Sequence, residues 1–224
     1  MTYSIAARCA ETGMFGVAIA SSSPAVAARC SYAAAGAGAM CSQNVTDPRL
    51  GLRGLELLAG GHDADAALAA LVKDGAHIAY RQLTLVDGAG RSAVFTGAKA
   101  LGVSGSAHGA NVACAGNLLA SPDVPAAMKA AFDGSKGPLG DRLVAAMRAG
   151  RDAGGEAGPV HSVGLKLVRD VPWPVADLRV DWTDDDPIEA LAALWAIYAP
   201  QLDTYVQRAI DPREAPSYGV PGDV

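Results

Sequence analysis

The most constraining feature of the sequence is the alternation of β-hairpins with pairs of helices. Residues 2–8 and 14–20 have the apolar composition of strands and flank a turn at residues 11–13, which predicts an N-terminal hairpin. The small, apolar, glycine-interrupted segment 34–42 predicts a buried central strand. Two helices, further strands, two more helices, two strands and final helices follow. Hairpins mixed with paired helices predict an α+β layered sandwich.

Local end signals mark the helices. Asp47 and Pro48 are typical of a helix cap and first helical residue, and Asp63 is typical of the cap of the next helix, which Gly75 ends. Residues 184–186 are an acidic run directly before Pro187, and this pattern predicts the start of another helix. The predicted helices are 48–58, 64–74, 124–132, 139–149 and 187–198, and the later predicted strands are 80–86, 91–96, 111–115, 162–168 and 176–181.

Composition predicts one domain with a single large core. Half of the residues are hydrophobic, only 18% are charged, and 26 are glycine, so sheets and helices can approach closely. No interior linker is visible, and we expect one domain over residues 1–210 with an extended, proline-containing tail over residues 211–224. The net charge of -5 and the lack of a dense Lys/Arg cluster argue against a nucleic-acid partner.

The distribution of cysteine and apolar residues predicts a cytoplasmic protein without a metal or other cofactor. The N-terminus lacks a basic region followed by an apolar stretch, and no window reaches the ~18 apolar residues of a membrane span. The four cysteines and four histidines are scattered and have no zinc-ligand spacing. We therefore interpret the cysteines as free buried thiols in a reducing compartment.

The usual catalytic signatures are absent, which directs attention to the start of the chain. There is no G-x-S-x-G elbow, no P-loop and no H-E-x-x-H. Residue 2 is Thr, which is small enough to allow removal of Met1. The α-amine of Thr2, with a pKa of about 8, would then lie beside its own hydroxyl and act as general base for it. Thr2 would supply nucleophile and base together.

Six blocks in order resemble one known family. They are TYSIAARCAETGMFGVAIASSSPAV, GAMCSQNVTDPRLGLRGLELL, YRQLTLVDGAGRSAVFTG, AGNLLASPDVPAAM, GPLGDRLVAAMRAG and WPVADLRVDW. The chain resembles the Ntn-hydrolase-like family known as domain of unknown function 1028, from Thr2 to about Ile210. The resemblance implies a four-layer αββα Ntn-hydrolase sandwich with Thr2 as nucleophile. It also favours hydrolysis of the C–N bond of a small amide or lactam.

Ser21 and Ser22 end the second predicted strand and are candidate catalytic and substrate-binding residues. In this family a Ser at the end of this strand is often followed by Lys or Arg, whereas in this sequence Ser21 is followed by Ser22. Gly116 and Asn117 are the candidate oxyanion donor, since the glycine allows close approach and the amide can hold developing negative charge. A turn-capping role for Asn117 is the alternative.

Further candidates lie at strand ends and in a glycine-rich loop. Gln43 and Asn44 precede a helix and either line the site or tie a turn. Arg81 either binds a substrate carboxylate or forms an ion pair. Glu156 follows two glycines and is the candidate for activating water, and His161 is a candidate specificity residue with a titratable ring or simply an exposed one.

Three functions stay open. The first is an amidohydrolase with an N-terminal Thr2. The second keeps the fold but uses an internal hydroxyl, such as Ser4 or Ser21, or a water activated by Glu156, as a cyclohydrolase or isomerase. The third is a non-catalytic protein that binds a small ligand. The apolar final helices, with Leu191, Leu194 and Trp195, predict a homo-oligomer, most simply a dimer.

Overall fold

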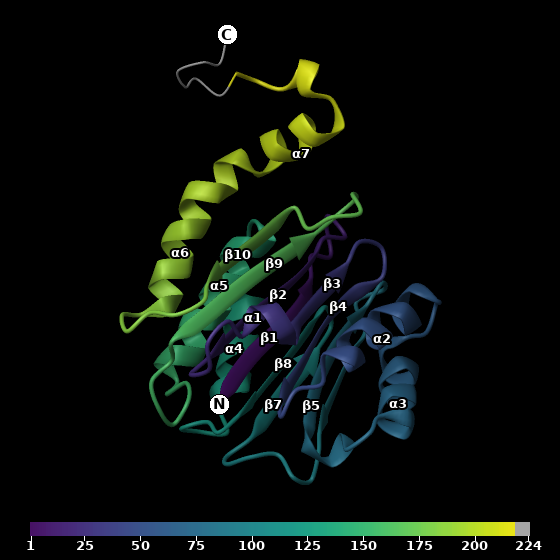
Figure 1. Cartoon of the computed structure of the whole chain (residues 1–224), viewed down its shortest axis with the longest axis vertical. Coiled ribbons are helices and arrows are strands. Elements are labelled where there is room, and N and C mark those ends of the chain that lie inside the picture. Colours follow the sequence, from purple (N-terminus) through teal and green to yellow (C-terminus); the bar gives the residue numbers. More distant parts are fainter. Residues whose placement is uncertain (218–224) are drawn as a thin grey trace.

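Two antiparallel sheets stack face to face in the structure, a computed structural model that describes residues 1–217 (Figure 1). The larger sheet has six strands in the order β10-β9-β2-β1-β8-β7, and the smaller has four in the order β3-β4-β5-β6. The strands are β1 (Thr2–Arg8), β2 (Phe15–Ser21), β3 (Ser31–Ala34), β4 (Gly38–Asn44), β5 (Arg81–Asp87), β6 (Ser92–Thr96), β7 (Gly105–Gly109), β8 (Val112–Asn117), β9 (Ser162–Val168) and β10 (Ala176–Val180).

Helix pairs cover the outer face of each sheet. Helices α4 (Val124–Gly134) and α5 (Leu139–Asp152) pack on the six-stranded sheet, and α2 (Pro48–Ala59) and α3 (Ala64–Asp74) pack on the four-stranded sheet. The layers therefore follow the order helix, sheet, sheet, helix. This arrangement confirms the predicted α+β fold class with four αββα layers.

Three aspartates cap helices as their positions predict. Asp47 accepts a hydrogen bond from the backbone nitrogen of Arg49 at 3.1 Å, and Asp63 accepts one from Ala66 at 2.8 Å. Asp186 caps α6 (Pro187–Tyr198) by accepting from the nitrogens of Ile188 and Glu189. Each cap satisfies amide donors that have no partner within the helix.

Two segments differ from their predictions. The single strand predicted over residues 34–42 is wrong, because Gly36 adopts a positive φ of 72° and turns the chain between β3 and β4. Residues 105–109, for which no strand is predicted, form β7, where His108 pairs with Ala113 of β8. A short helix, α1 (Ala27–Cys30), lies between β2 and β3.

Alternation along β1 divides its side chains between two cores. Tyr3, Ile5 and Ala7 belong to the core beneath α4 and α5, whereas Ala6 belongs to the apolar core between the sheets. Because successive side chains point to opposite faces of a strand, Thr2 shares the inter-sheet face with Ala6. The N-terminal end of β1 thus carries a polar side chain into the space between the sheets.

The C-terminal helices form an arm whose first helix, α6, packs against α5, β9 and β10, and whose end extends beyond the layered body (Figure 1). It comprises α6, a 3₁₀ turn (Ala199–Gln201) and α7 (Leu202–Ile210), and a further 3₁₀ turn (Pro212–Glu214) follows. The remainder of the predicted tail, residues 218–224, lies outside the described residues, and the single-domain boundary at residue 210 stays a prediction.

The structure also bears on the predicted membrane and cysteine properties of the chain. Among the helices within residues 1–217, none has the length and apolar character needed to span a bilayer. Cys9, Cys30, Cys41 and Cys114 are buried and free, which confirms their interpretation as unpaired thiols.

Candidate functional site

A row of polar side chains crosses the six-stranded sheet at one end of the sandwich. Thr2 lies opposite Asn117 of β8, and Ser21 lies opposite Ser162 of β9. Thr2 and Ser21 are neighbours across β1 and β2, with their hydroxyl oxygens 3.4 Å apart. All four residues are at most 5% exposed. We call these four residues the polar row.

The Met1 carbonyl oxygen is the point where the two central hydroxyls of the polar row meet. The Thr2 hydroxyl donates to it, and the Ser21 hydroxyl donates to it at 2.5 Å. The Ser21 oxygen in turn accepts from the backbone nitrogen of Ser23 at 3.1 Å, which fixes its position. Two buried hydroxyls are thereby oriented toward a single carbonyl group.

Side-chain amides of the four-stranded sheet face the polar row. The Oε1 atom of Gln82 accepts from Gln43 Nε2 at 2.8 Å and from Asn117 Nδ2 at 3.1 Å, so it links the two sheets. Gln82 Nε2 donates to the Gly116 carbonyl at 2.9 Å and to Thr96. Asn117 Oδ1 and Gln43 Oε1 are buried and have no partner among the described residues. Asn117 is therefore held in place while one of its two N–H groups stays free of Gln82.

Glu156 approaches the same end of the sheet from a loop. Gly154 and Gly155 adopt positive φ values of 113° and 57°, and an isolated bridge pairs Leu119 with Glu156. The Glu156 carboxylate accepts from the Ser22 backbone nitrogen at 3.2 and 3.1 Å. Burial raises the pKa of Glu156 from its ordinary 4.5 to about 7, against the opposing effect of the nearby N-terminal ammonium.

The other predicted site residues divide into two groups. Ser22 and Gly116 lie beside the site, since the backbone of Ser22 binds Glu156 and the carbonyl of Gly116 binds Gln82. Asn44 and Arg81 form the second group, whose side chains bond backbone groups outside the polar row. Asn44 adopts a positive φ, donates to the Tyr80 carbonyl and accepts from the Leu101 nitrogen, and Arg81 donates to the Val45 carbonyl.

His161 is half-buried, and its ring turns toward the segment between β10 and α6. The ring stacks on Trp182 with centroids 4.1 Å apart, and Nδ1 lies 2.8 Å from the Thr183 carbonyl oxygen. The backbone nitrogen of His161 bonds the Ser21 carbonyl, so the residue adjoins the polar row through its main chain only.

The sequence interpretation did not include Gln82 or Ser162 among the site residues. Gln82 is the second residue of β5 and Ser162 is the first residue of β9, and only the pairing register brings them to Gln43 and Ser21. A prediction of that register from the alternation of apolar and polar residues is the one signal that would have found them. Within residues 1–217, no three His, Cys, Asp or Glu side chains are grouped to hold a metal ion.

Comparisons with known proteins identify the family. The chain is 31% identical to protein SPO2555 from Silicibacter pomeroyi, a solved DUF1028 structure, with a TM-score of 0.82 over 88% of this chain and 89% of the other. Anbu proteins from Hyphomicrobium sp. strain MC1 (a Gly-1 mutant) and Yersinia bercovieri are 11% and 13% identical, cover 91% and 92% of this chain and 97% of theirs, and have TM-scores of 0.41 and 0.40.

No curated protein sequence is similar enough to the chain to count as a match. The DUF1028 family, described as a family of unknown function, matches residues 2–191. Because that match spans most of the 224 residues, the chain belongs to the DUF1028 family.

Proposed function

We propose that the protein is an Ntn-type hydrolase that cleaves the C–N bond of a small amide or lactam with Thr2 as its N-terminal nucleophile. The observation that carries this proposal is the convergence of the Thr2 and Ser21 hydroxyls on one carbonyl oxygen, with Asn117 opposite Thr2 in the sheet. The αββα layering agrees with the fold that the family resemblance implies. The protein would be cytoplasmic and would need no cofactor.

The first step requires removal of Met1. The freed α-amine of Thr2 accepts the proton of the Thr2 hydroxyl, and Oγ1 forms a bond to the carbonyl carbon of the substrate. Collapse of the tetrahedral intermediate breaks the C–N bond, and the leaving nitrogen takes up the proton. Water then hydrolyses the acyl ester at Oγ1, releases the acid and restores the hydroxyl.

The Met1 carbonyl supports this assignment as a stand-in for the substrate acyl group. In the intact chain this carbonyl oxygen already receives hydrogen bonds from the groups that would surround a substrate carbonyl. The Ser21 hydroxyl and the free N–H of Asn117 Nδ2 are the donors available to an oxyanion there. Donors fixed before the reaction stabilise developing charge in a buried site at little reorganisation cost.

Glu156 favours a second candidate, in which Met1 is retained and water is the nucleophile. A buried carboxylate with a pKa of about 7 is suited to accept a proton from water near neutral pH. Glu156 would then serve a cyclohydrolase or isomerase whose Thr2 and Ser21 hydroxyls bind the substrate. This candidate keeps the site and changes only the nucleophile.

Intact-mass measurement combined with a hydrolysis screen tests the proposal. We expect the purified protein to lack Met1 and to release ammonia or a carboxylic acid from members of a panel of small amides and lactams. Thr2→Ala should remove turnover, whereas Thr2→Ser should retain part of it.

The alternatives give different results in the same experiment. A protein that retains Met1 and is inactivated by Glu156→Gln but not by Thr2→Ala would support the water mechanism. Ligand binding that is equal in the Thr2→Ala variant, without turnover in either protein, would support the non-catalytic function and overturn the proposal.

A further inference from the structure

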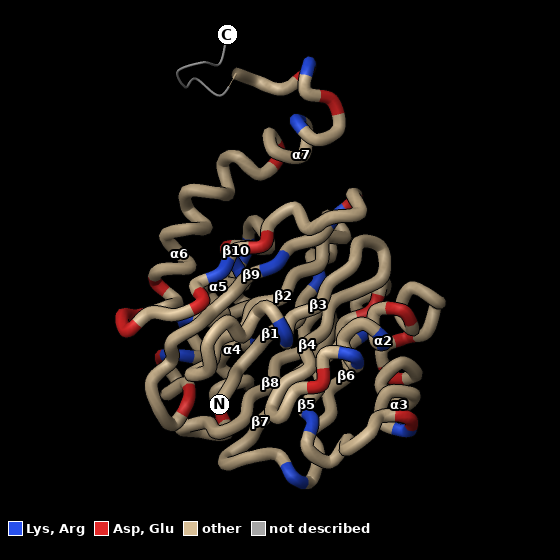
Figure 2. Tube along the Cα trace, in the orientation of Figure 1, with Lys and Arg blue, Asp and Glu red and all other residues tan. Residues whose placement is uncertain are grey.

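A cavity of about 340 Å³ opens on the helical side of the sheet, between the 154–158 loop and the start of α6. Tyr3 and Glu156 line its buried part, whereas the exposed Asp184 and Asp185 line its mouth. Figure 2 shows the acidic stretch of the chain immediately before α6. Four carboxylates and one guanidinium lie among the lining residues, so the cavity is predominantly acidic.

The Tyr3 hydroxyl is the unpaired polar group of this cavity. Tyr3 is fully buried, and its Oη atom has no hydrogen-bond partner among the described residues. Burial, followed by the negative charges of Glu156 and Asp186, raises the pKa of Tyr3, so its hydroxyl stays neutral. A neutral phenol oxygen can accept a hydrogen bond from a ligand N–H. A buried polar group normally has a partner, and its absence here points to a ligand or water.

Four backbone donors at the glycine pair and at the start of α6 are already in use. The nitrogens of Gly154 and Gly155 donate to the carbonyls of Arg151 and Gly150 at 2.9 Å. The nitrogens of Ile188 and Glu189, at the start of α6, donate to the Asp186 carboxylate. These four amides are therefore not free to bind an anion at the helix start or at the glycine pair.

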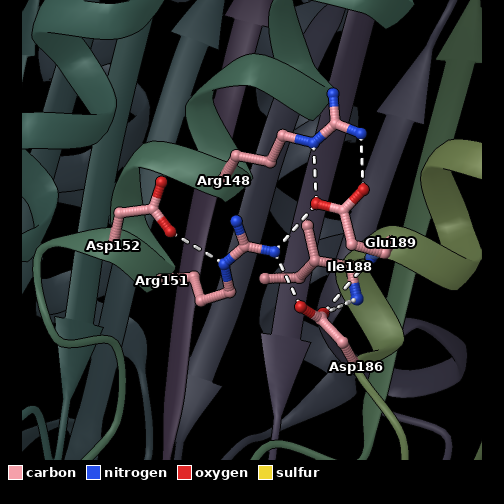
Figure 3. A network of polar contacts seen from close by, with 6 residues as sticks. All are labelled: Arg148, Arg151, Asp152, Asp186, Ile188 and Glu189. Atoms are coloured by element: carbon pink, nitrogen blue, oxygen red, sulfur yellow. Dashed lines mark hydrogen bonds and ion pairs between the residues drawn. The ribbon is translucent and has the colours of Figure 1, made fainter.

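The single guanidinium of the cavity is also occupied. Arg151 bonds Asp152 at 2.9 Å, Asp186 at 2.7 Å and Glu189 at 2.8 Å, as Figure 3 shows. Glu189 also binds Arg148, which joins α5 to α6 and fixes this wall. Three carboxylates surround the Arg151 charge, so it adds little attraction for an anionic ligand.

The remaining acidic groups are not arranged for a metal ion. Asp185 has no ion pair among residues 1–217, and Asp184 lies 3.4 Å from the ring nitrogen of His161. No three acidic, His or Cys side chains of the described residues are grouped to hold a metal. Carboxylates at the mouth and a phenol oxygen at the floor instead match a cation with several N–H donors.

From this lining we propose that the cavity between the 154–158 loop and α6 binds a small organic cation, a primary ammonium or guanidinium group. The N–H groups of the cation donate to Tyr3 Oη and Glu156 at the floor, and Asp185 attracts it at the mouth. Met1 itself does not line the cavity, so the proposal requires neither Met1 removal nor hydrolysis.

Calorimetric titration with two probes of equal shape tests this site. Propylguanidinium carries the charge and donors of the proposed ligand, and propylurea has nearly the same shape without charge. We expect propylguanidinium to bind and propylurea to bind at least about tenfold more weakly, as expected for a charged hydrogen-bonded group. Equal affinity for both probes, or no binding of propylguanidinium, would overturn the proposal.

Two variants and one control locate the binding. Tyr3→Phe removes only the unpaired hydroxyl, so folding is preserved, and we expect it to weaken propylguanidinium binding by about three- to tenfold. Asp185→Asn should weaken it further. Asp65→Asn removes an exposed charge from α3, away from the cavity, and should leave the affinity unchanged. A loss of affinity in Asp65→Asn equal to that in Asp185→Asn would indicate attraction by net charge alone and would also overturn the site.

Discussion

The hydroxyl oxygens of Thr2 and Ser21 lie 3.4 Å apart across β1 and β2. Each hydroxyl has one hydrogen, and both donate to the Met1 carbonyl instead of to each other. The relation between Thr2 and Ser21 is therefore convergence on a third group. If the proposed hydrolysis is correct, Ser21 acts on the substrate carbonyl and does not serve as the base for Thr2.

Ser21→Ala is expected to lower kcat of the proposed hydrolysis by about 10²-fold, since removal of one oxyanion donor typically costs 10²–10³-fold. The α-amine of Thr2 would still activate its hydroxyl, so KM should change much less. Steady-state kinetics on the best substrate from the amide panel measures both constants.

Ser162→Ala is the matched control, because Ser162 lies next to Ser21 in the same row. Its hydroxyl donates to the Ser23 carbonyl at 2.6 Å, and its loss should cost about 1 kcal/mol of unfolding free energy. We expect kcat to stay within about twofold of the wild type. An equal loss of kcat in both variants would mean that Ser21 acts through packing and not as a donor.

We predict that Glu156 makes the stability of the wild type depend on pH and that the Glu156→Gln variant lacks this dependence. The pKa of Glu156 is about 7 in the folded chain and close to 4.5 when exposed, so the folded state holds the proton more tightly. The resulting stabilisation is complete below about pH 4.5 and is lost as the pH rises through about 7. Over that window the wild type should lose up to about 3 kcal/mol relative to Glu156→Gln. Urea unfolding of both proteins at several pH values measures this difference.

The opposite sign would contradict the finding that burial outweighs the N-terminal ammonium and the Ser22 amide at Glu156. A wild type that gains stability relative to Glu156→Gln between pH 5 and 8 would require a carboxylate stabilised by a close cation. Glu189 is an internal reference for that behaviour, because hydrogen bonds from Arg148 and then Arg151 lower its pKa to about 2. Its contribution is present above its ordinary pKa and disappears only in acid.

Local signals made the helices and the strand ends predictable. Asp47, Asp63 and Asp186 each bond amides two or three residues away, so the information lies within one turn of chain. Segment 34–42 was wrongly predicted because its small residues run through a turn that only Gly36 marks. The pairing of strands in the folded protein decides where such a run of small residues is interrupted by a turn, and the local sequence does not encode that pairing.

The site was predictable only where it coincides with strand ends. Thr2, Ser21 and Asn117 stand at the ends of β1, β2 and β8, and the structure brings them side by side. Gln82 is buried within β5 and enters the site through its register with Gln43. The burial that raises the pKa of Glu156 depends on how its loop closes over the sheet, and periodicity carries no information about it.

Gly140→Ala is expected to destabilise the fold by about 1–3 kcal/mol through overpacking. A Cβ at this position would lie 2.2 Å from the Trp195 ring, which cannot easily retreat because its Nε1 donates to Asp141 at 2.6 Å. Gly134→Ala is the control, since nothing lies within 4 Å of its Cβ and its φ is not positive. Thermal unfolding should show a lower Tm for Gly140→Ala and an unchanged or higher Tm for Gly134→Ala. Equal Tm values for the two variants would mean that α5 and α6 can move apart at residue 140 without loss of stability.

The projecting arm is the expected contact surface of the predicted homodimer. Ile197 and Ile210 are 67% and 61% exposed along α6 and α7, and Leu194 and Tyr205 are partly exposed beside them. Burial of such side chains against a second copy would favour association, whereas a charge placed there would oppose it.

We expect the wild type to be dimeric in light scattering at micromolar concentration and Ile197→Glu to be monomeric and folded. Leu52→Glu, at a 60% exposed position of α2, should remain dimeric. A monomeric wild type would show that the homodimer prediction is wrong, and dissociation by Leu52→Glu would place the interface on α2 instead of the arm.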